Sequence, residues 1–181
     1  MKVTAYRVFG RRNILREAQH AAPSAADLVA RNVRGRMPRV EIVLTTPQGM
    51  GELNARAESA LVPGASPRAV DKSRRMVARD SRRSSGLTMP TRNGALVLLN
   101  VHQHPHPGLL AVTLVHELVH VMQLSRPGVR ELYLNYVRHA LDVAPMSRRE
   151  LRFFERHMAA EEDEAYRMES ALTPQLNAYA A

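Results

Sequence analysis

The chain has 181 residues, which suits one domain, and its formal net charge of +9 favours acidic partners. It contains no cysteine, which excludes disulfides, thiolate nucleophiles and cysteine-ligated metals. Any metal site must therefore use His, Asp, Glu or backbone oxygen. No stretch approaches the roughly 20 apolar residues of a membrane span, and residues 1–19 lack the apolar core of a signal peptide, so we expect a soluble, cytoplasmic protein.

The positive charge comes almost entirely from arginine, since Lys2 and Lys72 are the only lysines among 26 basic residues. This skew, together with abundant alanine, indicates a GC-rich genome as much as selection for phosphate binding. Aromatic residues make up 4% of the chain and Trp is absent, so surfaces on which bases stack are scarce. Nucleic-acid binding is the weaker interpretation of the charge, and we expect a peptide or protein partner.

The first third of the chain predicts strands on either side of a helix. Residues 2–9 alternate well enough for a short strand. Ser24 and Asp27 follow the capping-box pattern and predict a helix that runs to about Arg34. The β-branched run 40–45 predicts a buried strand.

The next segments are less regular. Residues 46–51, TPQGMG, are expected to form a turn, and 52–62 are compatible with helix or strand. Residues 63–94 are rich in Pro, Gly and Ser and carry eight Lys or Arg against two Asp, which predicts a basic loop region with at most one helix around 68–80. A phosphate-binding arm is the alternative for this loop.

A hairpin is predicted after this loop. Asn93 and Gly94 form a dipeptide typical of a tight turn, between GLTMPT and the strongly apolar strand 95–101.

The segment 109–124 predicts a buried helix that carries an HExxH motif, formed by His116, Glu117 and His120. Residues four apart on a helix stack one turn above each other, so both imidazoles can reach one zinc ion. The glutamate after the first histidine then faces a water on that ion.

The rest of this helix agrees with a buried polar site. Thr113, His116, Glu117, His120 and Gln123 fall within one arc, and the remaining surface is apolar. Burial of two imidazoles and a carboxylate is costly unless they are paired or bound to metal. The alternative is a pair of core histidines with backbone partners and Glu117 in an ion pair.

A second long helix is predicted over 147–172, opened by a capping box of Ser147 and Glu150. Its apolar stripe runs through Leu151, Phe154, Met158, Ala165 and Leu172. Such a helix can supply the third protein ligand that a catalytic zinc needs.

Four acidic residues in a row lie on this helix. Glu161 and Glu162 border the apolar stripe, whereas Asp163 and Glu164 project away from it. Helical periodicity thus leaves Glu161 and Glu162 as candidates for the third ligand.

The segments HELVHVMQ at 116–123 and EDEAY at 162–166 resemble the gluzincin group of metallopeptidases, especially small single-domain members with a downstream Glu-x-Glu-Ala segment. In that group the third ligand is a Glu followed three residues later by a small residue, which corresponds to Glu162 and Ala165. The resemblance implies an α+β, zincin-like domain with a small twisted sheet, an active-site helix and a C-terminal ligand helix. It covers about 40–172 of the single domain 1–181.

With this alignment, Glu161 and Glu164 are expected to tolerate alanine as surface residues do. Tyr166 departs from the family pattern, because many relatives have Asp or Asn there to orient a zinc-bound histidine. A phenol can also donate or accept a hydrogen bond, and Asp163 and Glu169 are alternatives that the sequence does not separate.

The run His102, His104 and His106 is a competing metal site, because alternation on a strand places all three on one face. Pro105 and Pro107 argue against a continued strand. A loop at the rim of a cleft, without permanent metal, is the preferred interpretation.

The predicted function is zinc-dependent hydrolysis of peptide bonds, with Zn²⁺ held by His116, His120 and Glu162 and with Glu117 as general base. By resemblance, an extended substrate adds as a strand beside 95–101. Four residues are candidates for the donor that stabilises the oxyanion: Tyr133, Tyr136, His139 and Tyr166.

Two other classes of protein remain open. One is a basic nucleic-acid or assembly protein, such as a phage-encoded one, with a structural zinc site and phosphate bound by 63–93; its affinity would fall steeply with salt. The other is a metallopeptidase-like binding module without turnover.

Overall fold

The computed structural model describes residues 1–105 and 107–179. In this part of the chain six helices surround a small mixed sheet, so the α+β class is confirmed. The elements are β1 (Lys2–Ala5), α1 (Arg12–Asn32), β2 (Val40–Thr45), α2 (Pro47–Leu61), α3 (Pro67–Asp80), β3 (Gly86–Thr91), β4 (Gly94–Asn100), a 3₁₀ turn (Val101–Gln103), α4 (Pro107–Leu124), α5 (Val129–Ala140) and α6 (Arg148–Tyr179).

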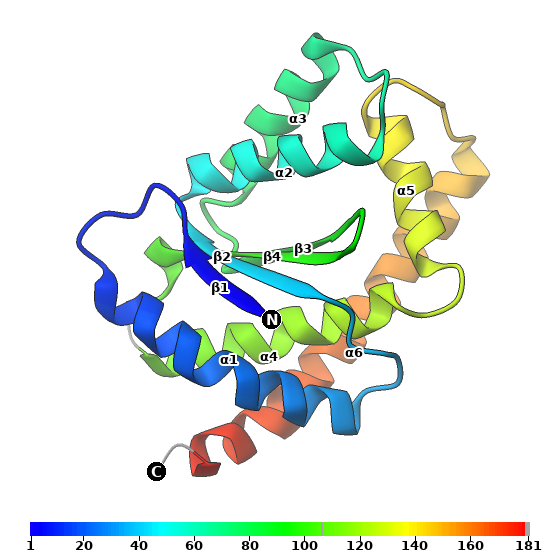
Figure 1. Cartoon of the computed structure of the whole chain (residues 1–181). Helices are drawn as coiled ribbons and strands as arrows, with labels where there is room; N and C mark the ends of the chain where they lie inside the picture. Colours follow the sequence, from blue (N-terminus) through cyan, green and yellow to red (C-terminus); the bar gives the residue numbers. More distant parts are fainter. Residues whose placement is uncertain (106, 180–181) are drawn as a thin grey trace.

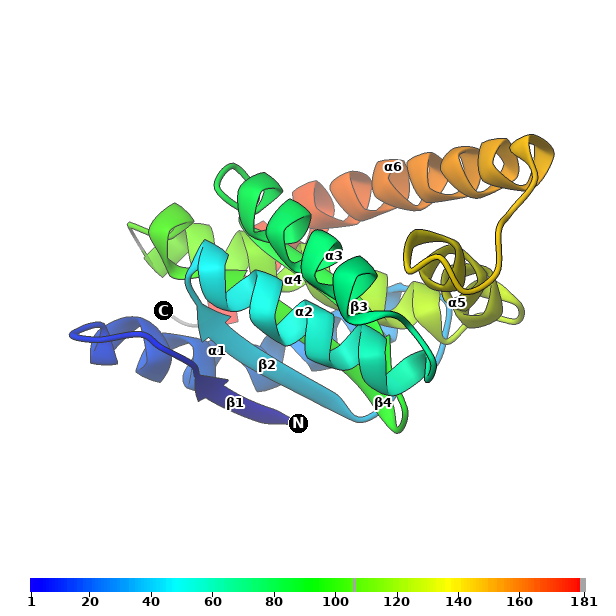
Figure 2. The same ribbon diagram turned by 90° about the horizontal axis from the view of Figure 1, so that it is seen from above.

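The sheet has the strand order β1-β2-β4-β3. Strands β1, β2 and β4 are parallel, and β3 pairs antiparallel with β4, which confirms the predicted hairpin. Its two turn residues are Arg92 and Asn93 rather than Asn93 and Gly94, because Gly94 pairs with Thr91 as the first residue of β4. Helices cover both faces of the sheet (Figure 1): α2 lies on one face with α3 packed on it, while α1 and α4 lie on the other. Seen from above, α6 runs along α4 (Figure 2).

Strand β4 is apolar from Ala95 to Leu99 because both of its faces are covered. Val97 and Leu99 join the core beneath α1 and α4, whereas Leu96 and Leu98 join the core beneath α2. A continuous apolar run is typical of such a central parallel strand. The prediction that 95–101 forms the edge of the sheet is therefore wrong, and the edge next to α4 is β3.

Helix α1 begins at Arg12, so the capping box predicted at Ser24 and Asp27 is wrong, and Pro23 lies inside the helix. Proline removes one backbone hydrogen bond there. The helix continues because small apolar residues at helical spacing bury one face against the core. These residues are Ala18, Ala22, Ala25, Ala26, Leu28 and Val29.

The turn predicted over 46–51 is instead the start of α2. The hydroxyl of Thr46 accepts a hydrogen bond from the Gly49 amide at 3.2 Å, and Pro47 occupies the first helical position. A Cβ at Gly51 would overlap the Arg74 carbonyl of α3, so this glycine permits close packing of two helices. Segment 63–94 is not mainly a loop: the helix allowed around 68–80 is α3, and GLTMPT at 86–91 is β3.

The capping box at the start of α6 is confirmed. The Ser147 amide donates to Glu150 Oε2 at 2.7 Å, and the Glu150 amide donates to Ser147 Oγ at 3.3 Å. The helix continues past the predicted end at 172, with Leu172 and Leu176 buried against α1 and α4. Among the described residues no single helix is long and apolar enough to cross a membrane; α4 and α5 meet that criterion only as a pair, bent by 97°.

Candidate metal centre

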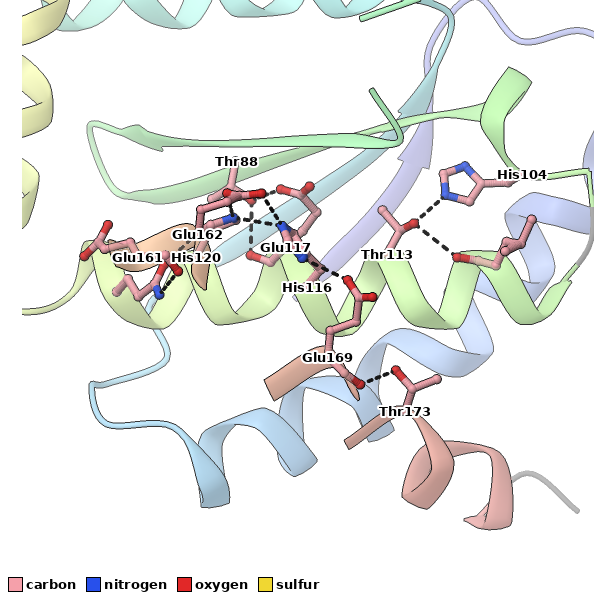
Figure 3. A network of polar contacts seen from close by, with 12 residues as sticks. Thr88, His104, Thr113, His116, Glu117, His120, Glu161, Glu162, Glu169 and Thr173 are labelled. Atoms are coloured by element: carbon pink, nitrogen blue, oxygen red, sulfur yellow. Dashed lines mark hydrogen bonds and ion pairs between the residues drawn. The ribbon is translucent and has the colours of Figure 1, made fainter. Parts of the chain in front are cut away.

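Three side chains from two helices converge between α4 and α6 (Figure 3). The Nε2 atoms of His116 and His120, one turn apart on α4, are 3.1 Å from each other. Glu162 on α6 places Oε1 at 3.4 Å from the first of these atoms and Oε2 at 3.1 Å from the second. These residues, selected from sequence, thus form a group able to hold a metal ion.

The outer nitrogen of each imidazole faces an acceptor. His116 Nδ1 lies 2.9 Å from Glu169 Oε2, and His120 Nδ1 lies 2.7 Å from Gln123 Oε1. Both Nδ1 atoms must therefore carry hydrogen and donate it. In the neutral imidazoles the lone pairs are then on the Nε2 atoms and point at the centre of the group.

Neighbouring groups fix the orientation of the Gln123 amide. Its Nε2 donates to the Glu161 carbonyl at 2.8 Å and to Glu164 Oε2 at 3.1 Å, so its oxygen is left for His120. Arg126 holds the Glu164 carboxylate with two hydrogen bonds of 2.7 Å. A chain of polar contacts therefore sets the tautomer of His120.

The donor set fits a small divalent cation. Two neutral Nε2 lone pairs and a carboxylate repel one another unless a proton or a cation lies between them. Tetrahedral bonds of about 2.0–2.1 Å place ligand atoms about 3.3 Å apart. The two Nε2 atoms are 3.1 Å apart, and each has a different Glu162 oxygen at 3.1 or 3.4 Å; with one ligand atom from each residue, the three atoms lie within 4.8 Å of one another. Three protein ligands also leave one position open for another molecule.

Without a cation, the same geometry retains protons on the histidines. Burial lowers the pKa of His120, but the hydrogen bond to Glu162 and the charge of Glu117 outweigh burial and raise it to about 9. The pKa of His116 is raised by the same two carboxylates against the effect of burial. Hydrogen bonds from both imidazoles lower the pKa of Glu162.

Glu117 lies beside the group formed by His116, His120 and Glu162, and it is 5% exposed. Burial raises its pKa, more than the nearby histidines and the Thr88 hydroxyl lower it. Thr88, on β3, donates to Glu117 Oε2 at 2.6 Å. A Cβ at Gly86 would overlap the same carboxylate, so the edge strand can lie this close only with glycine there. Neither contact has a local signal in the sequence, because Thr88 lies 29 residues before Glu117 and Gly86 lies earlier still.

These groups line a cleft of about 560 Å³ between β3, α4 and α6. Its walls include apolar side chains from several elements, among them Leu87, Leu109, Val112, Leu124, Tyr133 and Met158. The polar residues of α4 and α6 lie between these walls, as expected for a site that binds a partly apolar ligand.

Two expectations about the acidic run of α6 are wrong. Glu161 is 6% exposed and lies 3.2 Å from His157, and Glu164 is paired with Arg126, so neither is a surface residue. Periodicity missed these roles because it projects one helix alone, whereas Arg126 reaches α6 from beyond the end of α4. Of the four residues, Asp163 is the exposed one.

The structure also separates the alternatives for the orienting residue. Tyr166 places its ring edge against His116 with centroids 4.9 Å apart, and it is Glu169 that accepts from His116 Nδ1. Glu169 follows Glu162 by two helical turns, a spacing that puts both on one face and was available in the sequence. Ala165 is fully buried where α6 meets α4.

Of the four oxyanion candidates, Tyr133 and Tyr166 line the cleft. Tyr136 stacks on Phe154 with centroids 4.2 Å apart, and His139 Nδ1 accepts from the Met146 amide at 3.2 Å. Burial and the charge of Glu58 on α2 raise the pKa of Tyr133. The pKa of Tyr166 is also raised, and the charge of Glu162 is the largest cause.

In the competing histidine run, His102 and His104 do not share a strand face. His104 is 1% exposed, with Nδ1 at 2.7 Å from the Asn100 carbonyl and Nε2 at 2.9 Å from Thr113 Oγ1. His102 is exposed on the 3₁₀ turn rather than on a strand, and His106 lies outside the described residues. Both ring nitrogens of His104 are thus used within the protein.

Comparisons with protein families, with curated proteins and with solved structures found no match to this chain.

Proposed function

We propose that this chain is a zinc metallopeptidase of the HExxH type with a zincin-like domain, in which His116, His120 and Glu162 hold Zn²⁺. The observation that supports this most is the convergence of two Nε2 atoms and one carboxylate at 3.1 to 3.4 Å, with both Nδ1 atoms already donating outward. Imidazole and carboxylate ligands in a tetrahedral arrangement with one open position favour zinc over the other common divalent ions.

When bound, the ion supplies Lewis-acid chemistry, which polarises a carbonyl and makes water nucleophilic near neutral pH. Glu117 takes a proton from the attacking water as the oxygen–carbon bond forms. It then passes that proton to the amide nitrogen as the carbon–nitrogen bond breaks, so water is added across the peptide bond and no other reactant is needed. The burial that raises the pKa of Glu117 makes it a stronger base for this step.

The substrate lies along β3 rather than along 95–101. Strand β3 is the edge strand next to α4, and its Leu87 and Thr88 line the cleft beside Glu117. An extended peptide can add to this edge through main-chain hydrogen bonds. Tyr166 is our choice as oxyanion donor, because it lies on the cleft side beside His116 and the charge of Glu162 keeps its hydroxyl protonated.

Glu117→Gln tests this proposal. The variant retains both histidines and Glu162, so it should hold zinc and fold like wild type while peptide hydrolysis falls by roughly a thousandfold or more. Zinc content is measured by elemental analysis, and cleavage by mass spectrometry of a digested peptide library. The matched control is Glu155→Gln on the exposed side of α6, which should hydrolyse at the wild-type rate.

Two results would count against this function. If Glu117→Gln cleaves peptides as fast as wild type, the general-base mechanism is wrong. If zinc-loaded wild type cleaves no peptide in the library, the chain is a binding module with a metallopeptidase-like site.

A further inference from the structure

A band of positive charge follows the exposed side of α3 and the turn after it. Its residues on α3 are spaced by four, three and four positions, so they share one face of the helix. We name this surface the α3 basic band; its exposed members are Arg68, Lys72, Arg75, Arg79, Arg82 and Arg83.

Few carboxylates neutralise the α3 basic band. Asp71 pairs with Arg75 at 2.9 Å and with Arg74, and Asp80 pairs with Arg79 at 2.9 Å. Within residues 1–105 and 107–179, the other members of the band have no carboxylate partner. The band therefore keeps most of its charge for a ligand.

The band borders a concave pocket of about 600 Å³ where the end of α3 meets the start of α2. Its basic lining residues are Arg74, Arg75, Arg79, Arg82 and His102. The set of residues that line the pocket includes no Asp or Glu, and no Phe, Tyr or Trp on which a base would stack.

This basic pocket adjoins the metal cleft. Arg82 lines the pocket and its neighbour Arg83 lines the cleft, while His102 lines the pocket and its neighbour Gln103 lines the cleft. The two pairs are joined, because Gln103 Nε2 donates to the Arg82 carbonyl at 2.8 Å. The two pockets therefore border the same turn, and the side chains of Arg82 and Arg83 lie between them.

The turn that carries these arginines is held in place. Asn100 is fully buried, and its Nδ2 donates to the Ser81 carbonyl at 2.7 Å and to the Ser84 carbonyl at 3.1 Å. The Asn100 amide also donates to the Ser85 carbonyl at 2.9 Å. The backbone of residues 81–85 is thus fixed on both sides of Arg82 and Arg83, which reduces the entropy lost when a ligand binds there.

We infer that the α3 basic band docks an acidic segment of the polypeptide substrate, rich in Asp and Glu, whose neighbouring residues then lie in the metal cleft. This inference rests on the proposed function. A polypeptide fits better than nucleic acid, because a chain can be acidic in one segment and uncharged in the next. The cleft itself contains the carboxylates of Glu117, Glu161, Glu162 and Glu169, which repel a continuous polyphosphate.

The test uses zinc-loaded Glu117→Gln, so that docking is measured without turnover. Fluorescence anisotropy compares a peptide that carries an Asp/Glu run with the same peptide carrying Asn/Gln instead, and with a DNA duplex, at low and high salt. The acidic peptide should bind about tenfold more tightly than its neutral counterpart, and high salt should remove the difference. Adding Arg79→Glu and Arg82→Glu should abolish this preference.

The matched control adds Arg12→Glu and Arg31→Glu, which change the net charge equally on the exposed side of α1. It should keep the preference for the acidic peptide. The inference is overturned if both double variants lose the preference equally, because the effect is then one of net charge. It is also overturned if the DNA duplex binds more tightly and its binding is lost with Arg79 and Arg82, because the band is then a nucleic-acid site.

A separate measurement keeps the two proposals apart. If wild type cleaves the acidic and neutral peptides with equal kcat/KM, docking fails while peptidase function stands. If it cleaves neither but the anisotropy difference persists, the peptidase function fails and the α3 basic band remains an acidic-peptide site.

Discussion

Two histidine sites lie along helix α4, and their hydrogen bonding differs. Near its start, Thr113 meets His104, whose two ring nitrogens both have partners within the protein. One and two turns later, His116 and His120 each use Nδ1 for a protein acceptor, but their Nε2 atoms face each other and Glu162. The first site is complete without a ligand, whereas the second becomes electrostatically satisfied only with a proton or a cation.

The difference shows that burial alone does not mark a ligand histidine. His104 is more buried than His116, at 1% against 9% exposed. What separates them is the balance of donors and acceptors at each ring. A histidine whose second nitrogen points at other acceptors is the candidate for a metal.

The largest expected effect separates the two sites directly. His116→Ala with His120→Ala removes two of three ligands, so zinc content should fall from one ion per chain to none and zinc should no longer raise Tm. His104→Ala should keep its zinc. Elemental analysis and thermal melts with and without zinc measure both; full zinc retention in the double variant would refute the site.

Glu162→Ala comes next. Loss of the carboxylate that faces both Nε2 atoms should lower zinc affinity by two or more orders of magnitude, roughly the loss of one ligand bond. Asp163→Ala, one residue away and exposed, should bind zinc as wild type does. A competition titration with a chelator gives both affinities, and equal values would show that the third ligand has been assigned to the wrong residue.

Gln123→Ala tests the residue that sets the tautomer of His120. Zinc affinity should fall by about 10–100-fold, as is typical when a group behind a metal-bound histidine is removed. Gln175→Ala on the exposed side of α6 is the control and should have no effect. An unchanged affinity in Gln123→Ala would mean that the 2.7 Å contact with His120 does not orient the ring.

The smallest effect concerns His104. Because burial lowers its pKa below the ordinary 6.5, the folded protein prefers the neutral ring. Its contribution to stability is present above pH 6.5 and is lost as the pH falls through the lowered pKa. His104→Ala should cost about 1–3 kcal/mol at neutral pH, because the Asn100 carbonyl loses the ring nitrogen bonded to it and Thr113 keeps only the Leu109 carbonyl; the cost should be smaller at acidic pH. Urea unfolding at several pH values measures this, and a pH-independent difference would contradict it.

The parts of the fold that sequence predicted well have strong local signals. The buried helix α4, the hairpin of β3 and β4, and the capping box of α6 each depend on residues close together in the chain. The wrong predictions concern segments whose secondary structure depends on packing against residues far away in the sequence. Helix α1 continues through Pro23 because its alanines pack against the core, and Gly51 allows α2 and α3 to pack closely instead of forming a turn.

The site shows the same division. His116, Glu117 and His120 lie within one motif, and the family resemblance selected Glu162, which the structure places against both imidazoles. The contacts of Thr88 and Arg126 join segments 29 and 38 residues apart, and no local pattern indicates them. Such partners follow from how helices and strands pack, which a single sequence does not reveal.

The division of the metal centre between α4 and α6 has a consequence for the newly made chain. Glu169 follows His116 by 53 residues, and at about 5–20 residues per second synthesis takes several seconds to cover that interval. During that time the two histidines exist without either carboxylate of α6. The site that we propose binds zinc is therefore incomplete on the ribosome until α6 has been made and has docked on α4.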